Sequence, residues 1–243
     1  MKSSLLNMVL VLFGITAVAA FLVGMVNNIT KDAIAQTEQK NKDLAKLEVL
    51  PAFEGEAEFE DKCCEIGDFV VNVTTVKAGG EVVGYAVEAP SITRSGYADR
   101  IKLMVGFVEK DSTTVINGIK VLKQSETPGL GANMIKEGNS LERSAVGKEP
   151  KTLTFAVSKE GGSFDALTGS TISSRAYANA VETAYAGYLW AKGELPSADD
   201  AKSGATNSED TKSSAKTCED GKSGATMTNH EEPEAQKGEV DNE

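Results

Sequence analysis

The chain has 243 residues and a formal net charge of −11, with 25 Lys and Arg against 36 Asp and Glu. This acidic balance argues against a nucleic-acid partner, because clustered Lys and Arg side chains bind phosphate backbones. The single histidine, His230, lies close to the C-terminus, which excludes Ser-His-Asp and Cys-His catalysis from the part of the chain expected to fold.

The N-terminal segment has no charged residue between Lys2 and Lys31, and Leu5 to Val26 is nearly continuous apolar sequence. This length is typical of a helix that crosses a bilayer. The alternative is a signal peptide cleaved at Ala17 to Ala19, but the apolar run continues well past that site. We therefore expect an uncleaved single-pass anchor over residues 1–30. Lys2 favours an N-terminus inside the inner (cytoplasmic) membrane, with the rest of the chain on the outer, periplasmic side.

Residues 31–66 are expected to form a stalk helix and a linker. Apolar residues at helical spacing predict a helix from Asn28 to Leu50 that can continue the span, and Pro51 ends it. The composition fits a solvated stalk, because the heptads are too few for a dimerising coiled coil.

The apolar pattern changes to that of β-strands at Phe69. Residues 69–76 are rich in β-branched side chains and lead through Gly79 and Gly80 into a second run at 81–88, which predicts a hairpin. The other expected elements are strands at 101–108 and 115–122 with a turn at 109–112, a shorter strand at 153–157, and an amphipathic helix from Ile172 to Leu195. Antiparallel strands followed by a helix predict an α+β domain over residues 67–195.

The C-terminal segment, residues 196–243, is expected to be a disordered acidic tail, because it has too few apolar residues for a core. It holds 12 acidic and 5 basic residues and so carries −7 of the net charge. Degenerate repeats recur there every ten residues. Asp200 to Thr206 returns as Asp220 to Thr226, and residues 210–216 are a decayed copy between them.

The three cysteines give neither a disulfide framework nor the spacing of a zinc site. Cys63 and Cys64 are adjacent, and neighbouring cysteines rarely bridge each other because their Cα atoms lie too close. Cys218 lies in the tail. We expect these residues to be structural or incidental; the alternative places Cys63 and Cys64 near the metal centre of a partner.

The stretch from Asp165 to Ser173 has the composition of a tight turn that leads into a helix. Gly169 permits a backbone conformation closed to other residues, and the small Ser170 leaves Thr171 accessible. A phosphate here would meet unpaired amides and the positive end of the helix dipole. The expected contacts are the amides of Ile172, Ser173 and Ser174, the hydroxyls of Ser173 and Ser174, and the guanidinium of Arg175 unless it points to solvent. The simpler alternative is an ordinary helix start, because Ser and Thr are favoured N-caps.

A second motif, residues 125–131, reads Ser-Glu-Thr-Pro-Gly-Leu-Gly and by itself predicts a turn with a positive φ at glycine. Together the two motifs resemble the FMN-binding domain found in the G subunit of Rnf electron transport complexes. The stretch beginning at Asp165 matches the flavinylation signature, in which a flavin transferase attaches FMN through its phosphate to the threonine. Two departures are Ser170, where Ala is more frequent, and Gln124, where the family often has His. Gly96 and Tyr97 also resemble this family, and the resemblance covers roughly residues 1–193.

The resemblance implies that the chain is an electron carrier and does not catalyse a reaction by itself. Rnf complexes pass electrons between reduced ferredoxin and NAD⁺ and couple this to Na⁺ or H⁺ movement. A G subunit would hold covalent FMN as a phosphoester on Thr171, with the other membrane and soluble subunits of the complex as partners. The further cofactor-binding residues implied are Glu126, Thr127, Gly129, Leu130, Gly131, Thr168, Gly169, Ser170, Ser173 and Ser174.

Two alternatives remain at this stage. The C subunit of the Na⁺-translocating NADH:quinone reductase shares the anchor, the domain and the covalent FMN, and a membrane-anchored binding module would carry no flavin. The tail adds a hypothesis, because its outer repeats also fit the flavinylation signature and make Thr206 and Thr226 candidates for extra FMN. The middle copy lacks the required Gly and Thr. The simpler interpretation is an acidic, solvating tail.

Overall fold

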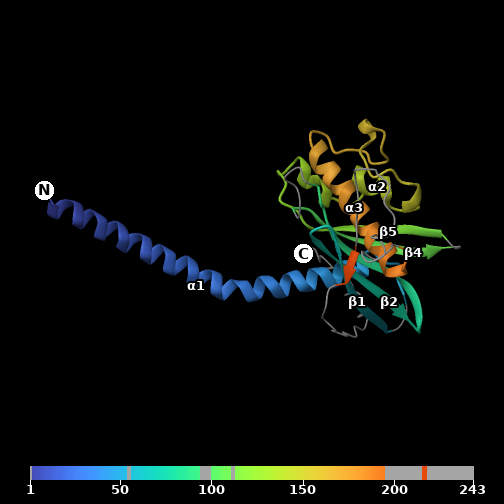
Figure 1. Cartoon of the computed structure of the whole chain (residues 1–243), viewed down its shortest axis with the longest axis horizontal. Helices are drawn as coiled ribbons and strands as arrows, with labels where there is room; N and C mark the ends of the chain where they lie inside the picture. The colour runs from blue at the N-terminus through green and yellow to red at the C-terminus, as the bar shows by residue number, and fades with distance from the viewer. Residues whose placement is uncertain (1, 54–55, 94–99, 111–112, 195–214, 218–243) are drawn as a thin grey trace, which may run out of the picture. The chain divides into compact units, whose positions relative to one another are not determined.

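Helix α1, Lys2–Glu48, forms the N-terminal part of the chain (Figure 1). The computed structural model describes residues 2–53, 56–93, 100–110, 113–194 and 215–217. Among these, α1 is the one helix long and apolar enough to cross a membrane, with a mean hydropathy of 2.7 in its apolar window. Its 47 residues correspond to about 70 Å at the rise of an α-helix. The expected span and stalk are thus one continuous helix.

The chain divides into two units, Met1–Leu44 and Ala45–Glu243. The second unit is built on an antiparallel sheet in which consecutive strands are neighbours, in the order β5-β4-β3-β2-β1. The strands are β1 Ala57–Ile66, β2 Phe69–Ala78, β3 Glu81–Pro90, β4 Lys102–Lys110 and β5 Thr113–Lys123. Both predicted hairpins are confirmed as β2–β3 and β4–β5. Together with the flanking helices they confirm the α+β class.

Strand β1 lies inside the expected linker and was missed by sequence reasoning. Four of its ten residues are acidic and Ile66 is its only β-branched residue, so the segment has little intrinsic strand preference. It forms a strand because every residue pairs with β2, from Ala57 opposite Ala78 to Ile66 opposite Phe69. Pairing with an established neighbour overrides the weak local signal.

A sixth strand, β6 at Ala215–Thr217, pairs antiparallel with the other edge of β1 (Figure 1). These three residues belong to the tail that was expected to be disordered, and for them that expectation is wrong. The remainder of the tail lies outside the described residues.

Helix α3, Thr171–Lys192, packs on one face of the sheet and buries Ala180, Val181 and Ala184 completely. Close approach is possible because Gly187 has no side chain. A Cβ there would lie 2.7 Å from Cγ1 of Val71 on β2. The helix was predicted to reach Leu195, but it ends at Lys192, because Gly193 adopts the left-handed conformation with φ 74°.

The opposite face of the sheet receives the last turn of α1 and the two residues after it. Val49 and Leu50 are buried there with Ala86 and Met104. They lie in a slot, called the glycine slot below, that is formed by Gly84 on β3, Gly106 on β4 and Gly118 on β5. A Cβ at Gly106 would lie 2.0 Å from the carbonyl oxygen of Val49, and a Cβ at Gly84 would lie 2.8 Å from Leu50 Cδ2.

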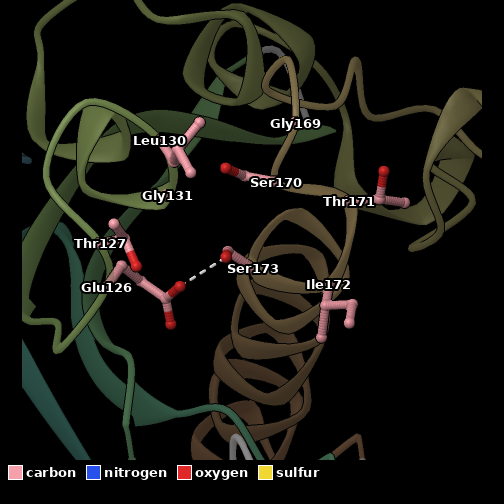
Figure 2. Close-up of a pocket in the computed structure, with 9 residues that line it drawn as sticks. All are labelled: Glu126, Thr127, Leu130, Gly131, Gly169, Ser170, Thr171, Ile172 and Ser173. Atoms are coloured by element: carbon pink, nitrogen blue, oxygen red, sulfur yellow. Dashed lines mark hydrogen bonds between the residues drawn. The ribbon is translucent and has the colours of Figure 1, made fainter.

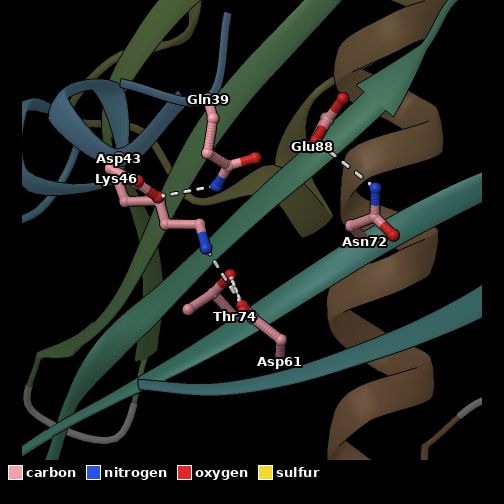
Figure 3. Close-up of polar contacts among 7 residues, drawn as sticks. All are labelled: Gln39, Asp43, Lys46, Asp61, Asn72, Thr74 and Glu88. Atoms are coloured by element: carbon pink, nitrogen blue, oxygen red, sulfur yellow. Dashed lines mark hydrogen bonds and ion pairs between the residues drawn. The ribbon is translucent and has the colours of Figure 1, made fainter. Parts of the chain in front are cut away.

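Polar contacts hold the same turn of α1 against β1 and β2 (Figure 3). The Lys46 ammonium forms an ion pair with Asp61 on β1 at 3.1 Å, and the Thr74 hydroxyl on β2 donates to the same carboxylate. The Asn117 side-chain amide donates to the carbonyl oxygen of Val49 at 3.0 Å. The end of α1 is therefore bonded to the sheet as well as packed on it.

The segment between β5 and α3 contains only short helical elements. They are η1 Gly131–Ile135, α2 Ser140–Ala145, η2 Pro150–Thr152 and η3 Ser158–Glu160. The strand predicted at 153–157 is wrong, since only Val157 forms a bridge, with Phe164. Its backbone groups are used locally instead: the amide of Phe164 donates to Ala156, and that of Ser163 donates to Thr154.

Candidate functional site

The turn that precedes α3 is held from three directions. The backbone amide of Asp165 donates to the Ser144 hydroxyl of α2 at 2.9 Å, and its carboxylate accepts from Ser158 at 2.7 Å. The amide of Leu167 donates to the Ser174 hydroxyl at 3.0 Å. Gly169 completes the turn with φ 73°, a conformation that side chains rarely adopt. The turn is therefore fixed before the helix begins.

The helix start leaves backbone donors available. The first helical bond runs from the Ser174 amide to the Ser170 carbonyl at 2.9 Å, so Thr171, Ile172 and Ser173 have no intrahelical acceptor for their amides. Ser170 occupies the N-cap position, yet its side chain caps no amide. The ordinary capped start is therefore not what this sequence forms, and three amides remain at the positive end of a 22-residue helix.

Ser174 does not have the role expected from the sequence. Its amide is bonded within the helix, its hydroxyl donates to the Ser170 carbonyl at 2.8 Å, and its side chain is completely buried. It is a structural residue that fixes the turn rather than a phosphate contact. Arg175 also points elsewhere, because its guanidinium forms an ion pair with Glu160.

The loop after β5 folds over this helix start. The Gln124 side chain accepts from the backbone amide of Glu126 at 2.6 Å, and the carbonyl of Thr127 accepts from the amide of Leu130 at 3.1 Å. Gly129 has φ 80°, as its place in the turn predicted. Gln124 stands where the resembled family often has His. Its side chain shapes the loop by accepting this hydrogen bond from the loop backbone.

The loop and the helix start meet in one pocket of about 320 Å³, drawn in Figure 2. Ligand pockets usually begin at about this size. The Ser173 hydroxyl donates to the Glu126 carboxylate at 2.6 Å across it. A Cβ at Gly131 would lie 2.7 Å from both groups, so a side chain at this position would force one of them to move. The pocket is lined by Glu126, Thr127, Leu130, Gly131, Gly169, Ser170, Thr171, Ile172 and Ser173.

Eight of the eleven residues named from the sequence line this pocket, whereas Gly129, Thr168 and Ser174 do not. Thr171 is half-buried, and in Figure 2 it lies across the pocket from Glu126 and Thr127. The candidates Thr206 and Thr226, as well as Gly96 and Tyr97, lie outside the described part of the chain.

Sequence reasoning about the cofactor site missed Ile172 as a lining side chain. It is 49% exposed at the second position of α3, and Leu130 in the facing loop is 45% exposed. The available signal was an isoleucine at a helix start, off the apolar face that packs on the sheet. Two exposed apolar side chains at the same pocket indicate a surface suited to a flat apolar ligand.

The electrostatic character of the pocket is simple. Glu126 is the only ionisable side chain among the lining residues, and no Lys or Arg is among them. An anion would therefore be held by amides and hydroxyls at the helix start. Within the described residues, no group of three His, Cys, Asp or Glu side chains could hold a metal ion.

Comparison with known proteins gives consistent results. The FMN-binding domain family matches residues 96–186, which include the whole pocket. The chain is 35% identical over 182 residues to the G subunit of the Na(+)-translocating ferredoxin:NAD(+) oxidoreductase complex of Acetobacterium woodii, covering 71% of this chain and 86% of the relative. It is 32% identical over 194 residues to the G subunit of the ion-translocating oxidoreductase complex of Aliivibrio fischeri, covering 76% and 88%.

A third relative comes from Methanosarcina acetivorans. This G subunit of an ion-translocating oxidoreductase complex is 33% identical over 175 residues, which cover 70% of this chain and 87% of the relative. These matches extend over most of both sequences, and all three relatives are described as G subunits of ion-translocating oxidoreductase complexes. The chain therefore belongs to the family of G subunits of ion-translocating oxidoreductase (Rnf) complexes.

Proposed function

We propose that this chain is the membrane-anchored flavoprotein of an Rnf complex and that it relays electrons through FMN attached as a phosphoester to Thr171. The observation that carries the proposal is the pocket itself. It joins an accessible threonine, three amides without helical acceptors and two exposed apolar side chains. The relatives, which are G subunits by name, support an Rnf complex over the NADH:quinone reductase, whose C subunit was the closest alternative.

The residues of the pocket fit the parts of FMN. A phosphate on the Thr171 oxygen would lie at the positive end of α3, where the amides of Ile172 and Ser173 can donate. Leu130 and Ile172 offer apolar contact for the isoalloxazine ring. Glu126 would repel a phosphate, so its position across the pocket favours attachment on the Thr171 side. When bound, FMN supplies the redox chemistry, while the protein holds and orients it.

Covalent attachment explains why the pocket can be shallow. An ester bond retains the cofactor without deep burial, so the flavin can remain accessible to neighbouring carriers. We infer that a flavin transferase modifies Thr171 during maturation and that other Rnf subunits exchange electrons with the flavin. With the N-terminus inside the inner membrane, as Lys2 favours, the domain would lie on the outer side.

Intact mass of the full chain tests the attachment. After coexpression with a flavin transferase, the membrane-extracted protein should carry FMN, and Thr171→Ala should lose one FMN increment. Thr152→Ala is the matched control, because Thr152 is an exposed threonine that lies outside the pocket. If Thr171→Ala kept every increment of the wild type, Thr171 would not be the attachment site.

The same measurement tests the tail repeats. We propose that Thr206 and Thr226 can each carry a further FMN, because a transferase that reads a short peptide needs no folded site. The wild type should then show more than one increment, and Thr206→Ala with Thr226→Ala should reduce it to one. A wild type with a single increment, absent from Thr171→Ala, would refute the tail sites and leave the folded site intact.

A further inference from the structure

Glu126 is fixed in the pocket through both its backbone and its side chain. Its amide donates to the Gln124 side chain and its carboxylate accepts from the Ser173 hydroxyl, both at 2.6 Å. Gly131 leaves room for this arrangement, since a Cβ there would lie 2.7 Å from a carboxylate oxygen and 2.9 Å from Cβ of Glu126. The half-buried carboxylate is therefore held against the start of α3, as Figure 2 shows.

The charge of this carboxylate is not balanced by a basic side chain. No Lys or Arg lines the pocket, and within the described residues Glu126 forms no ion pair. Arg175, the basic residue closest in sequence to the helix start, is paired with Glu160. Glu126 is stabilised by the Ser173 hydroxyl together with the positive end of α3. The pocket thus combines one full negative charge with the partial positive charge of a helix end.

These two charges act on a flavin in opposite directions. Full reduction of FMN adds two electrons and either one or two protons, and the reduced ring with one proton is an anion. The positive end of α3 attracts this added negative charge and so favours reduction. A carboxylate in the same pocket repels it and so opposes reduction. The balance between them contributes to the reduction potential of the flavin.

We propose that Glu126 lowers the reduction potential of FMN in this pocket by offsetting the positive end of α3. Glu126 thereby makes the reduced flavin a stronger electron donor than the helix start alone would make it. The residue acts through its charge, and electrons pass to and from the flavin alone. The inference rests on the proposed function, because it requires FMN on Thr171.

The substitution Glu126→Gln isolates the effect of the charge. Glutamine has nearly the same shape, and its carbonyl oxygen can still accept from Ser173, so the contact across the pocket is kept. A unit charge roughly 10 Å from the ring, at an effective dielectric constant of about 20 and with some screening by salt, changes an equilibrium constant about tenfold. The variant should therefore favour the reduced flavin about tenfold more, a rise of about 30 mV for a two-electron couple.

The potential is measured on the full chain, extracted from membranes after coexpression with a flavin transferase. The parent and all variants carry Thr206→Ala and Thr226→Ala, so that neither candidate threonine of the tail can hold flavin, and intact mass confirms one FMN per chain. Flavin absorbance is then followed during titration with dithionite, which supplies the electrons, beside a reference dye of known potential. Glu126→Asp keeps the charge and Ser173→Ala removes the donor. The control Glu81→Gln removes an exposed carboxylate outside the pocket.

Glu126→Gln should raise the potential, whereas Glu126→Asp and Glu81→Gln should stay close to the parent. Ser173→Ala should not raise it, because the charge remains. An unchanged potential in Glu126→Gln would overturn the inference and leave the proposed function intact, since the FMN is present. An equal rise in Ser173→Ala would also overturn it, because the hydrogen bond and not the charge would then set the potential. A parent chain without FMN would overturn the proposed function, and the inference with it.

Discussion

The glycine slot offers a direct test of how the end of α1 is joined to the sheet, through the substitution Gly106→Ala. A Cβ at Gly106 would lie 2.0 Å from the Val49 carbonyl oxygen and 2.7 Å from its carbonyl carbon. These are backbone atoms, so no rotation of a side chain relieves the clash. The segment that holds Val49 and Leu50 must therefore move away from the sheet by roughly an ångström or more, to reach an ordinary contact distance.

The cost of this movement follows from the contacts that it breaks. The hydrogen bond from Asn117 to the Val49 carbonyl would be lost, at about 1 kcal/mol. Val49 and Leu50 are only 1% and 5% exposed, and each would lose part of a burial free energy of about 1.5–3 kcal/mol. Together the losses come to about 3 kcal/mol, the upper end for overpacking. For a unit of this size, the melting temperature should fall by about 6–12 °C.

Thermal unfolding of the full chain in detergent gives the measurement, followed by the fluorescence of its single tryptophan, Trp190, which packs against the core. Gly118→Ala should cost less, because its closest contact would be 3.0 Å. Gly24→Ala is the control, since its Cβ would meet nothing within 4 Å. If the Gly106→Ala protein melted within about 2 °C of the wild type, the close packing of Val49 in the glycine slot would be refuted.

Two further predictions concern pH. The hydrogen bond from the Lys192 ammonium lowers the pKa of Glu109 below 4.5, so this contact stabilises the fold above that pH and is lost as the pH falls through the lowered pKa. The difference in melting temperature between wild type and Glu109→Gln should therefore be present at pH 7 and shrink below pH of about 4; a pH-independent difference would contradict it. Burial raises the pKa of Glu182, and a hydrogen bond from Asn179 opposes this shift in part. The ionised carboxylate of Glu182 therefore destabilises the fold at pH values above the unfolded pKa of 4.5. Glu182→Gln should raise the melting temperature at pH 7 and have little effect near pH of about 4, and equal effects at both values would count against this cause.

The pocket shows how far sequence reasoning reaches into a site. The turn at Gly169 and the start of α3 are local features, so residue types within a few positions predicted them. That residues 125–131 belong to the same site came from resemblance, since nothing local connects them with Thr171. The structure supplied the contact that joins them, from Ser173 to Glu126, and the reason for Gly131 beside it.

Errors in the predicted elements have a related cause. Residues 153–157 look like a strand, but hydrogen bonds to Ser163 and Phe164 use their backbone groups and no strand of the main sheet is paired with them. β1 looks like a linker, but β2 provides a partner along its whole length. A strand exists only when another strand satisfies its backbone, and that partner is not encoded in the segment itself.

The sequence by itself determined the long apolar N-terminal helix, the two hairpins, the helix after Gly169 and the threonine at its start. These depend on composition, apolar period and turn chemistry, which act over a few neighbouring residues. Only the tertiary structure decided that Ser174 is buried while Ile172 lines the pocket, that three glycines receive the end of α1, and that β1 pairs with β2 along its whole length. Each of these depends on register or packing between different segments of the chain, which local sequence does not fix.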